Sequence, residues 1–211
     1  MKPTDLEQVR ADFAEKLREI AGLRSPSLVR ALATVPREAF VGPGPWKILR
    51  LPDLPSGWAG RRWAGHGGHP RYQLTPDDDP RHLYDMVLVA LDANRTLNNG
   101  EPASLSRWLD SLDLGPGDRF LHIGCGVGYY TAIAAEMVLP RGGVVGVEVD
   151  PQLAERAKRN LSARTDEGDD LLAQAYRRGT HESVRSLRRD QHAEGPECWL
   201  HAPRFCLSSV A

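Results

Sequence analysis

Two neighbouring stretches of the sequence determine the expected fold: residues 117–130 read GDRFLHIGCGVGYY, and residues 143–151 read GVVGVEVDP. Residues 120–123 form a short apolar run after a turn signal, which predicts a buried parallel strand. Residues 131–138 have a good helix-forming composition, and residues 144–149 predict a second buried strand. Together they predict a strand–loop–helix–strand unit of the kind that builds parallel α/β sheets.

The loop between the first strand and the helix is rich in glycine, with Gly124, Gly126 and Gly128 at alternate positions. Glycine lacks a Cβ atom, so such a loop turns sharply and lets a ligand come close to the backbone. The helix that follows directs its free N–H groups toward whatever the loop holds. Glu148 ends the second strand, at the separation of about 20 residues that lets an acid accept both hydroxyls of a ribose. The pattern therefore predicts a cofactor with a ribose; the alternative is a plain structural unit whose glycines only permit tight packing.

The spacing of the glycines distinguishes between cofactors. Dinucleotide enzymes carry G-x-G-x-x-G and hold a pyrophosphate at the helix N-terminus, whereas this loop is G-x-G-x-G followed by two tyrosines. It resembles motif I of the S-adenosyl-L-methionine-dependent methyltransferases, in which no phosphate has to be held, and it disfavours an NAD-binding oxidoreductase. The resemblance implies a cofactor site formed by His122, Gly124, Cys125, Gly126, Gly128, Tyr129, Glu148 and Val149.

Composition and charge narrow the class of protein. The 211 residues suggest one domain, or one domain with an appendage, and 41% hydrophobic with 26% charged residues is ordinary for a globular protein. A net charge of -1 gives no electrostatic case for nucleic acid or an anionic membrane as a partner. No apolar run reaches the roughly 18 residues that a membrane span needs, and the N-terminus lacks the apolar segment of a signal peptide.

The cysteines and histidines predict a cytoplasmic protein without a metal site. The three cysteines, Cys125, Cys198 and Cys206, form no C-x-x-C pair, which fits a reducing compartment and argues against a zinc site or a disulfide framework. His66 and His69 have no third ligand near them in the sequence, so we interpret them as solvated loop residues.

The first part of the chain contains two predicted helices and a family marker. Apolar residues at three- and four-residue steps predict a helix over residues 5–21, and a second helix is predicted over residues 26–34. Residues 35–41 read VPREAFV and resemble the V-P-R-E-x-F-V segment of the protein-L-isoaspartate O-methyltransferase family. We interpret the segment physically as a turn that does no chemistry, with Phe40 and Val41 anchored in the core.

Residues 42–80 are rich in Gly, Pro and Trp and show no sustained period, which is typical of long functional loops. Trp46, Trp58 and Trp63 are candidates to cover a pocket. Residues 81–91 carry apolar side chains that fit either a helix or a strand.

A second marker of the same family precedes the glycine loop, where residues 97–102 read LNNGEP. The isoaspartyl methyltransferases carry a segment similar to I-S-x-P in this place, over the methyl group, and Gly100 lies where the family has serine. The resemblance implies that Asn98, Asn99 and Gly100 form a substrate-side loop, whose amides donate and accept hydrogen bonds. The alternative is a turn selected only for its backbone shape. The next helix is predicted over residues 104–114, with an inward face of Leu105, Trp108, Leu109 and Leu112.

His122 marks a second departure from the family, which has an acid two residues before the first glycine. An imidazole hydrogen-bonds but offers no fixed negative charge to the cofactor's ammonium group, so binding relies more on backbone carbonyls. Some relatives with histidine here also carry an N-N-G-x-P loop and a G-Y-Y ending, and the chain resembles this divergent branch. We interpret Cys125 as a small side chain that fits between glycines, because transfer of a sulfonium methyl group needs no enzyme nucleophile.

The C-terminal part of the sequence looks different. The family resemblance covers roughly residues 15–163 and includes an amphipathic helix over residues 153–161. Residues 164–211 are dense in Arg, Asp and Glu and contain no run of Val or Ile. We therefore expect them to supply no strand, to leave the edge of the first strand bare, and to reflect a reading frame that is truncated or shifted after residue 163.

These observations predict an α/β fold: a partial Rossmann-like sheet of the class I methyltransferases, preceded by a helical, loop-rich N-terminal region. The expected division is an N-terminal region over residues 1–97, a cofactor-binding core over residues 98–163 and an atypical polar tail over residues 164–211. The resemblance implies methyl transfer from S-adenosyl-L-methionine to a carboxylate or other oxygen acceptor in a protein, peptide or small molecule. The alternatives are an inactive methyltransferase remnant that at most binds the cofactor, and an NAD-binding oxidoreductase.

Overall fold

The computed structural model of the chain describes residues 3–50, 72–163 and 206–207. The predictions for Trp58, Trp63, His66 and His69, and for most residues after 163, lie outside these ranges. The elements follow one another as α1 (Pro3–Ala21), α2 (Pro26–Thr34), α3 (Glu38–Val41), β1 (Lys47–Arg50), β2 (Gln73–Leu74), the 3-10 helix η2 (Pro80–Leu83), β3 (Val87–Asp92), β4 (Leu97–Asn98), α4 (Pro102–Ser111), β5 (Arg119–Ile123), α5 (Tyr129–Val138), β6 (Gly143–Val147), α6 (Pro151–Ser162) and β7 (Cys206–Leu207).

The N-terminal helices α1 and α2 lie where the sequence predicts them. Ser25 caps α2, because its Oγ accepts a hydrogen bond from the Leu28 N–H at 3.3 Å, and Pro26 occupies the first helical turn. Gly22 follows α1 with a φ of 64°, a left-handed conformation that ends a helix without strain when the residue is glycine. The VPREAFV segment contains the short helix α3, and Phe40 is buried as predicted.

The sequence does not predict the small antiparallel sheet, whose order is β2–β1–β3–β4. Strands β1, β2 and β4 have between two and four residues, which is too short to show a hydrophobic period. The ambiguous segment 81–91 resolves into η2 and then β3, where Ile48 of β1 pairs with Val89. Trp46 is buried at the start of this sheet, and its indole N–H donates to the Gly42 carbonyl at 2.8 Å.

The predicted strand–loop–helix–strand unit is present as β5, α5 and β6. The two strands run parallel, with Arg119 opposite Gly143 at the start of the pairing. β6 ends at Val147, earlier than predicted, so Glu148 and Val149 lie just beyond the strand. Nearly all of α5 is buried, because it packs between β6 and α2.

The expectation that residues after 163 supply no strand is wrong at one place. Cys206–Leu207 forms β7, which runs parallel to β5 with Cys206 opposite His122 and Leu207 opposite Ile123. An open edge offers unpaired N–H and C=O groups to any extended segment, and β7 takes this position. Within the described part of the chain, the second sheet therefore has the order β6–β5–β7, and the edge of β5 is not bare along these two residues.

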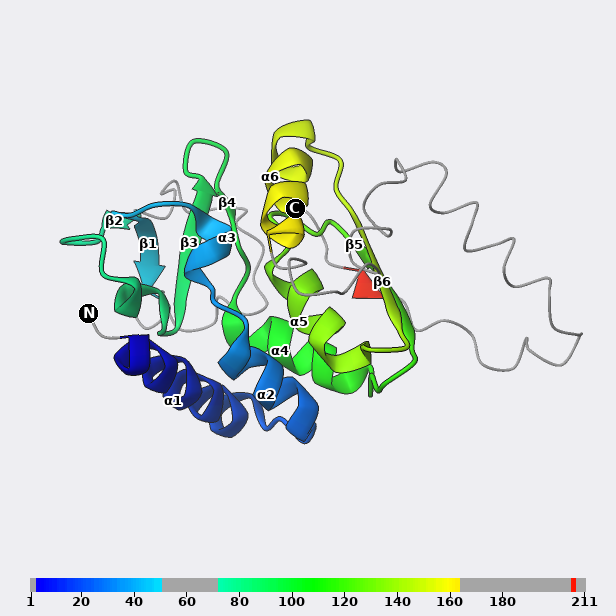
Figure 1. Ribbon diagram of the computed structural model, residues 1–211. Coiled ribbons are helices and arrows are strands. Elements are labelled where there is room, and N and C mark those ends of the chain that lie inside the picture. The colour runs from blue at the N-terminus through cyan, green and yellow to red at the C-terminus, as the bar shows by residue number, and fades with distance from the viewer. Residues whose placement is uncertain (1–2, 51–71, 164–205, 208–211) are drawn as a thin grey trace, which may run out of the picture.

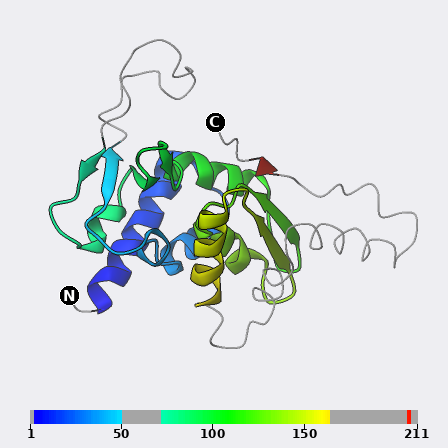
Figure 2. The same cartoon turned by 90° about the horizontal axis from the view of Figure 1, so that it is seen from above.

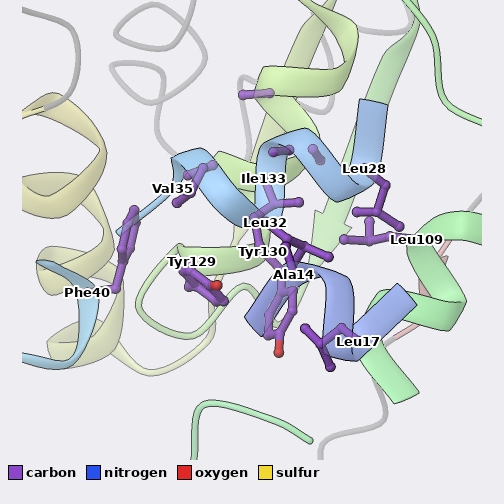
Figure 3. Packing of buried hydrophobic residues seen from close by; sticks show 14 of the residues in the cluster. Ala14, Leu17, Leu28, Leu32, Val35, Phe40, Leu109, Tyr129, Tyr130 and Ile133 are labelled. Carbon is purple, nitrogen blue, oxygen red and sulfur yellow. The ribbon is translucent and has the colours of Figure 1, made fainter. Parts of the chain in front are cut away.

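One hydrophobic cluster connects the N-terminal helices and both sheets. Figure 1 places β1–β4 at the left and β5 with β6 at the right, with α5 and α6 between them, and Figure 2 shows the same separation from above. In Figure 3, Tyr129, Tyr130 and Ile133 of α5 lie among side chains of α1 and α2, such as Leu17 and Leu32. The division into residues 1–97 and 98–163 stays a prediction.

Helix α4 differs from the prediction at one side chain. Trp108 is 42% exposed, whereas the neighbouring Leu109 is buried. The inward face includes Asp110 instead, whose Oδ1 accepts hydrogen bonds from the backbone N–H groups of Arg24 and Ser25 at 2.9 and 2.8 Å. Residues two positions apart on a helix do not share a face. With Asp110 directed at the start of α2, Trp108 therefore points away from it.

Candidate functional site

The glycine loop between β5 and α5 requires glycine for its backbone. Gly124, Gly126 and Gly128 all have positive φ values, of 75°, 57° and 92°, a conformation that other residues rarely adopt. The loop is attached to the end of β6, because the N–H groups of Gly124 and Cys125 donate to the Val147 carbonyl at 2.7 and 3.0 Å. The loop therefore lies at the carboxyl ends of both parallel strands, where ligands bind in open α/β sheets.

Gly126 and Gly128 differ in what surrounds them. A Cβ on Gly128 would lie 3.2 Å from atoms of Leu161 and 3.5 Å from Ala157, so this glycine permits close packing against α6. A Cβ on Gly126 would meet only the tip of Leu91, at 3.7 Å, among the described residues. The packing interpretation thus accounts for Gly128, whereas Gly126 leaves the backbone open to a ligand.

Glu148, which directly follows the end of β6, lies beside this open position. Its Oε2 accepts a hydrogen bond from the Gly126 N–H at 2.8 Å, and its Oε1 accepts one from the Asp150 N–H at 3.0 Å. Asp150 itself caps α6 through the Gln152 N–H at 2.9 Å and forms an ion pair with Arg95. Of the two acids after β6, Glu148 is therefore the one directed at the glycine loop.

Val149 follows this acid and is 86% exposed, the largest exposed fraction among the exposed large hydrophobic side chains of the described residues. An exposed apolar side chain beside a carboxylate is available for contact with an apolar part of a ligand. Its position next to Glu148 keeps it in the candidate site.

His122 lies buried beneath the loop and is held neutral. Its Nδ1 is 2.9 Å from the Thr131 Oγ1 on α5, and burial lowers the pKa of the imidazole to about 4. At neutral pH the side chain therefore carries no charge, and it offers one donor and one acceptor nitrogen.

Cys125 is an inert thiol in this environment. Burial raises its pKa to about 12, with a further contribution from the negative charge of Glu148. A Cβ on Gly146 would lie 3.1 Å from the Cys125 Sγ, so the thiol fills space against β6. This geometry agrees with the interpretation of Cys125 as a small packing residue.

Tyr129 presents its ring to the core and its backbone to the loop. The ring packs edge-to-face on Phe40 and on Tyr130, with centroid separations of 5.6 and 4.9 Å. Figure 3 shows Tyr129 between these two side chains. Its hydroxyl has no hydrogen-bond partner among the described residues. What Tyr129 offers the candidate site is therefore its N–H group, in the first turn of α5.

The two asparagines of the LNNGEP loop make different hydrogen bonds. The Asn98 Oδ1 accepts a hydrogen bond from the Gly100 N–H at 2.9 Å, which closes a local turn. The Asn99 Oδ1 instead accepts from the Val89 N–H at 3.1 Å and from the Arg37 Nη2 at 3.2 Å.

Gly100 has a backbone reason to be glycine. Its φ is 86°, and a Cβ there would lie 2.6 Å from the Leu105 Cδ1. The turn interpretation therefore explains Gly100 and Asn98, while the role of Asn98, Asn99 and Gly100 on the substrate side stays a prediction.

Contacts between residues far apart in the sequence bring β3 and α6 next to the glycine loop, and the β3–β4 turn next to the start of α6. Leu91 of β3 lies next to Gly126, and Arg95 in the β3–β4 turn pairs with the cap of α6. Asn160 of α6 donates to the carbonyls of Val127 and Phe40, at 3.0 and 3.2 Å. Sequence reasoning missed these contacts, because each joins segments with no common local pattern.

Among the described residues, no group of three His, Cys, Asp or Glu side chains could hold a metal ion, and no helix is long and apolar enough to cross a bilayer.

Residues 70–176, just over half of the chain, match the sequence model of the family described as protein-L-isoaspartate(D-aspartate) O-methyltransferase (PCMT). The chain belongs to this family. Protein-L-isoaspartate O-methyltransferase 1 of Archaeoglobus fulgidus is 32% identical over 159 residues, which cover 75% of this chain and 56% of that protein. The protein-L-isoaspartate O-methyltransferase of Aeropyrum pernix is 30% identical over 154 residues, 73% of this chain and 45% of that protein. The chain thus spans about half the length of the curated relatives it matches.

Two solved structures are also similar. A protein-L-isoaspartate O-methyltransferase matches with a TM-score of 0.46 and 21% identity, covering 75% of this chain and 39% of that one. A structure of a putative protein-L-isoaspartate O-methyltransferase from Plasmodium falciparum, in complex with S-adenosyl-L-homocysteine, matches with a TM-score of 0.47 and 16% identity, covering 73% of this chain and 55% of that one. The α/β fold of the chain is that expected for a class I methyltransferase, as the predicted βαβ unit and the family membership indicate.

Proposed function

We propose that the chain binds S-adenosyl-L-methionine at the glycine loop and transfers its methyl group to an oxygen acceptor, as in the protein-L-isoaspartate O-methyltransferases. Family membership supports the proposal. The observation that carries it is the position of Glu148, whose carboxylate accepts the N–H of Gly126, the glycine that stays open to a ligand. A carboxylate and an open backbone side by side at the ends of two parallel strands suit a ribose.

The residues present fit this cofactor in their chemistry. Glu148 would accept the ribose hydroxyls, Gly126 would let the ligand approach the backbone, and Val149 would provide apolar contact. His122 lies beneath the loop as a neutral group, so the ammonium of the cofactor would depend on backbone carbonyls. The complete proposed set is His122, Gly124, Cys125, Gly126, Gly128, Tyr129, Glu148 and Val149.

The proposed catalysis depends on alignment. The cofactor supplies a methyl group on a positively charged sulfur, which is already electrophilic. A carboxylate acceptor is ionised at neutral pH, so the chain needs no general base. Its residues would hold the acceptor oxygen in line with the methyl group, and Asn98, Asn99 and Gly100 are proposed to form the acceptor side. Cys125 takes no part as a nucleophile, because its thiol stays protonated.

The proposed acceptor is a carboxylate in a protein or peptide, and small molecules are the second class to test. The family name supports the first class. The net charge of -1 favours neither nucleic acid nor an anionic membrane as a partner. The proposed location is the cytoplasm, because the three cysteines form no C-x-x-C pair in the sequence.

The test is a transfer assay with S-adenosyl-L-methionine carrying a tritiated methyl group. The acceptors are an isoaspartyl peptide, the peptide of the same sequence with an ordinary aspartyl residue, and a small dicarboxylate. We expect label in the first peptide and release of volatile methanol on mild base treatment, since carboxyl methyl esters hydrolyse in base. Equal labelling of both peptides would mean that the chain does not distinguish an isoaspartyl from an aspartyl residue. Binding of the cofactor without transfer to any acceptor would favour the inactive remnant.

A further inference from the structure

Arg37, in the VPREAFV segment, is a fully buried cation with no acidic partner among the described residues. Its side chain is 0% exposed, and no Asp or Glu in residues 3–50 or 72–163 lies within ion-pair distance. Burying an unpaired charge is costly, so the groups that hold it must be well placed. The guanidinium donates to three oxygens: the Leu83 carbonyl at 2.6 Å, the Val87 carbonyl at 2.9 Å and the Asn99 Oδ1 at 3.2 Å.

These bonds determine the orientation of the Asn99 amide. Its side-chain oxygen accepts from two groups that can only donate, the Arg37 guanidinium and the Val89 N–H. An amide turned by 180° would direct its NH2 group at both donors and lose both bonds. Asn99 is 8% exposed, and its Nδ2 has no partner among the described residues, so the amide is held from the oxygen side alone.

The pairing of Asn98 in β4 with Ala90 already joins the start of the loop to β3, and Asn99 adds two further hydrogen bonds to this strand. Its own N–H donates to the Val89 carbonyl at 3.0 Å, so backbone and side chain both bind the same residue of β3. The Asn98 side chain does not share this task, because it closes the turn onto Gly100. Gly100, the next residue, lies close to the Tyr130 ring in the helix that starts at the glycine loop.

We propose that Arg37 is a positioning residue for methyl transfer. It fixes the Asn99 amide and thereby holds the Asn98–Gly100 loop at one distance from the glycine loop. The proposal rests on the proposed function only for the identity of the reaction; the attachment of the loop stands on the contacts alone. It gives the family-marker segment a role beyond anchoring Phe40 and Val41.

The experiment is a double-mutant cycle with Arg37→Met and Asn99→Leu in the full chain, with Arg30→Met as control. Arg30 is an exposed arginine on α2 whose side chain makes none of these contacts. Replacing both partners of a buried hydrogen bond by apolar side chains recovers part of the stability that either single change removes. We therefore expect the double variant to melt closer to the wild type than the sum of the single shifts predicts.

Loop order and transfer should not recover with stability. Hydrogen exchange at the Asn99 and Gly100 amides should be at least about tenfold faster in both single variants and in the double variant, while the Ala132 amide of α5 keeps its protection. The Kd for S-adenosyl-L-homocysteine should stay within about threefold, while kcat/KM for an isoaspartyl peptide falls roughly 10- to 100-fold. Arg37→Lys should behave like Arg37→Met, because an ammonium group cannot span three acceptors as the guanidinium fork does.

Two results would overturn the proposal. One is unchanged exchange of the loop amides in a folded Arg37→Met variant. The other is a double variant that regains loop protection and transfer together with stability, which would assign Arg37 to packing alone. A wild-type chain that binds no S-adenosyl-L-homocysteine, or that transfers no methyl group, would instead refute the proposed function, and hydrogen exchange would still decide whether Arg37 holds the loop.

Discussion

Replacing Glu148 by glutamine tests the candidate cofactor site with the smallest change in shape. The carboxylate accepts the N–H groups of Gly126 and Asp150 at 2.8 and 3.0 Å. It would also accept the ribose hydroxyls of the bound cofactor. Glutamine has one acceptor oxygen and an NH2 group, so at least one of these donors loses its partner, and the remaining bonds lose the assistance of the charge.

The expected cost follows from these contacts. Hydrogen bonds to a charged group contribute about 1.5–3 kcal/mol each. Loss of one such bond to the ribose lowers the affinity for S-adenosyl-L-homocysteine by roughly 10- to 150-fold. Isothermal titration calorimetry on the folded Glu148→Gln variant measures this directly.

The matched control is Glu155→Gln, which changes the same charge on an exposed position of α6. We expect this control to keep the wild-type affinity within about twofold, because exposed charges interact weakly through water. Wild-type affinity in Glu148→Gln would mean that the acid at the end of β6 does not hold the ribose. An equal loss in both variants would mean that net charge, rather than the carboxylate, governs binding.

Two further predictions concern His122 and Gly100. The pKa of His122 is about 4 in the folded chain and 6.5 in the unfolded chain. Between these pH values only the unfolded state takes up the proton. The stability that the neutral imidazole gives is therefore complete above pH 6.5 and is lost as the pH falls toward 4. Denaturant titrations from pH 7 to pH 4 should show the wild type losing about 3 kcal/mol more than His122→Gln, and parallel losses would contradict the buried neutral histidine. Gly100→Ser, which introduces the family's residue, should lower the free energy of unfolding, measured by urea denaturation, by about 1–3 kcal/mol, because φ is positive and the new Cβ meets Leu105. Gly22→Ser isolates the backbone term, since φ is also positive there and nothing lies within 4 Å; a smaller cost at Gly100 than at Gly22 would refute the steric argument.

The parts of the fold that the sequence predicts are those with strong local signals. Ser25 before Pro26 and Gly22 after α1 mark helix ends through backbone chemistry alone. The β5–α5–β6 unit follows from its apolar runs and glycines. The candidate cofactor residues could be named for the same reason, because a glycine loop and an acid at the next strand end are local in sequence.

The parts that the sequence does not predict depend on distant contacts. The antiparallel sheet of order β2–β1–β3–β4 consists largely of strands too short for a period, and it depends on pairs that are distant in the sequence, such as Ile48 with Val89. Trp108 points outward because Asp110 binds the start of α2. Arg37 gives no signal in a family-marker segment, since its partners lie 46 to 62 residues away. Strand β7 has only two residues, too few to show a period, and it is defined by its pairing with the distant strand β5.

The most direct test of the central claim is a calorimetric titration of the full chain with S-adenosyl-L-homocysteine and, separately, with NAD. We expect saturable one-to-one binding of the first ligand and no heat from the second. A folded Gly126→Val variant should bind neither, because a β-branched side chain would fill the space beside the Gly126 backbone, where a Cβ meets only the tip of Leu91 among the described residues. Binding of NAD alone, or S-adenosyl-L-homocysteine binding that survives in Gly126→Val at wild-type strength, would contradict a methyltransferase cofactor site at this loop.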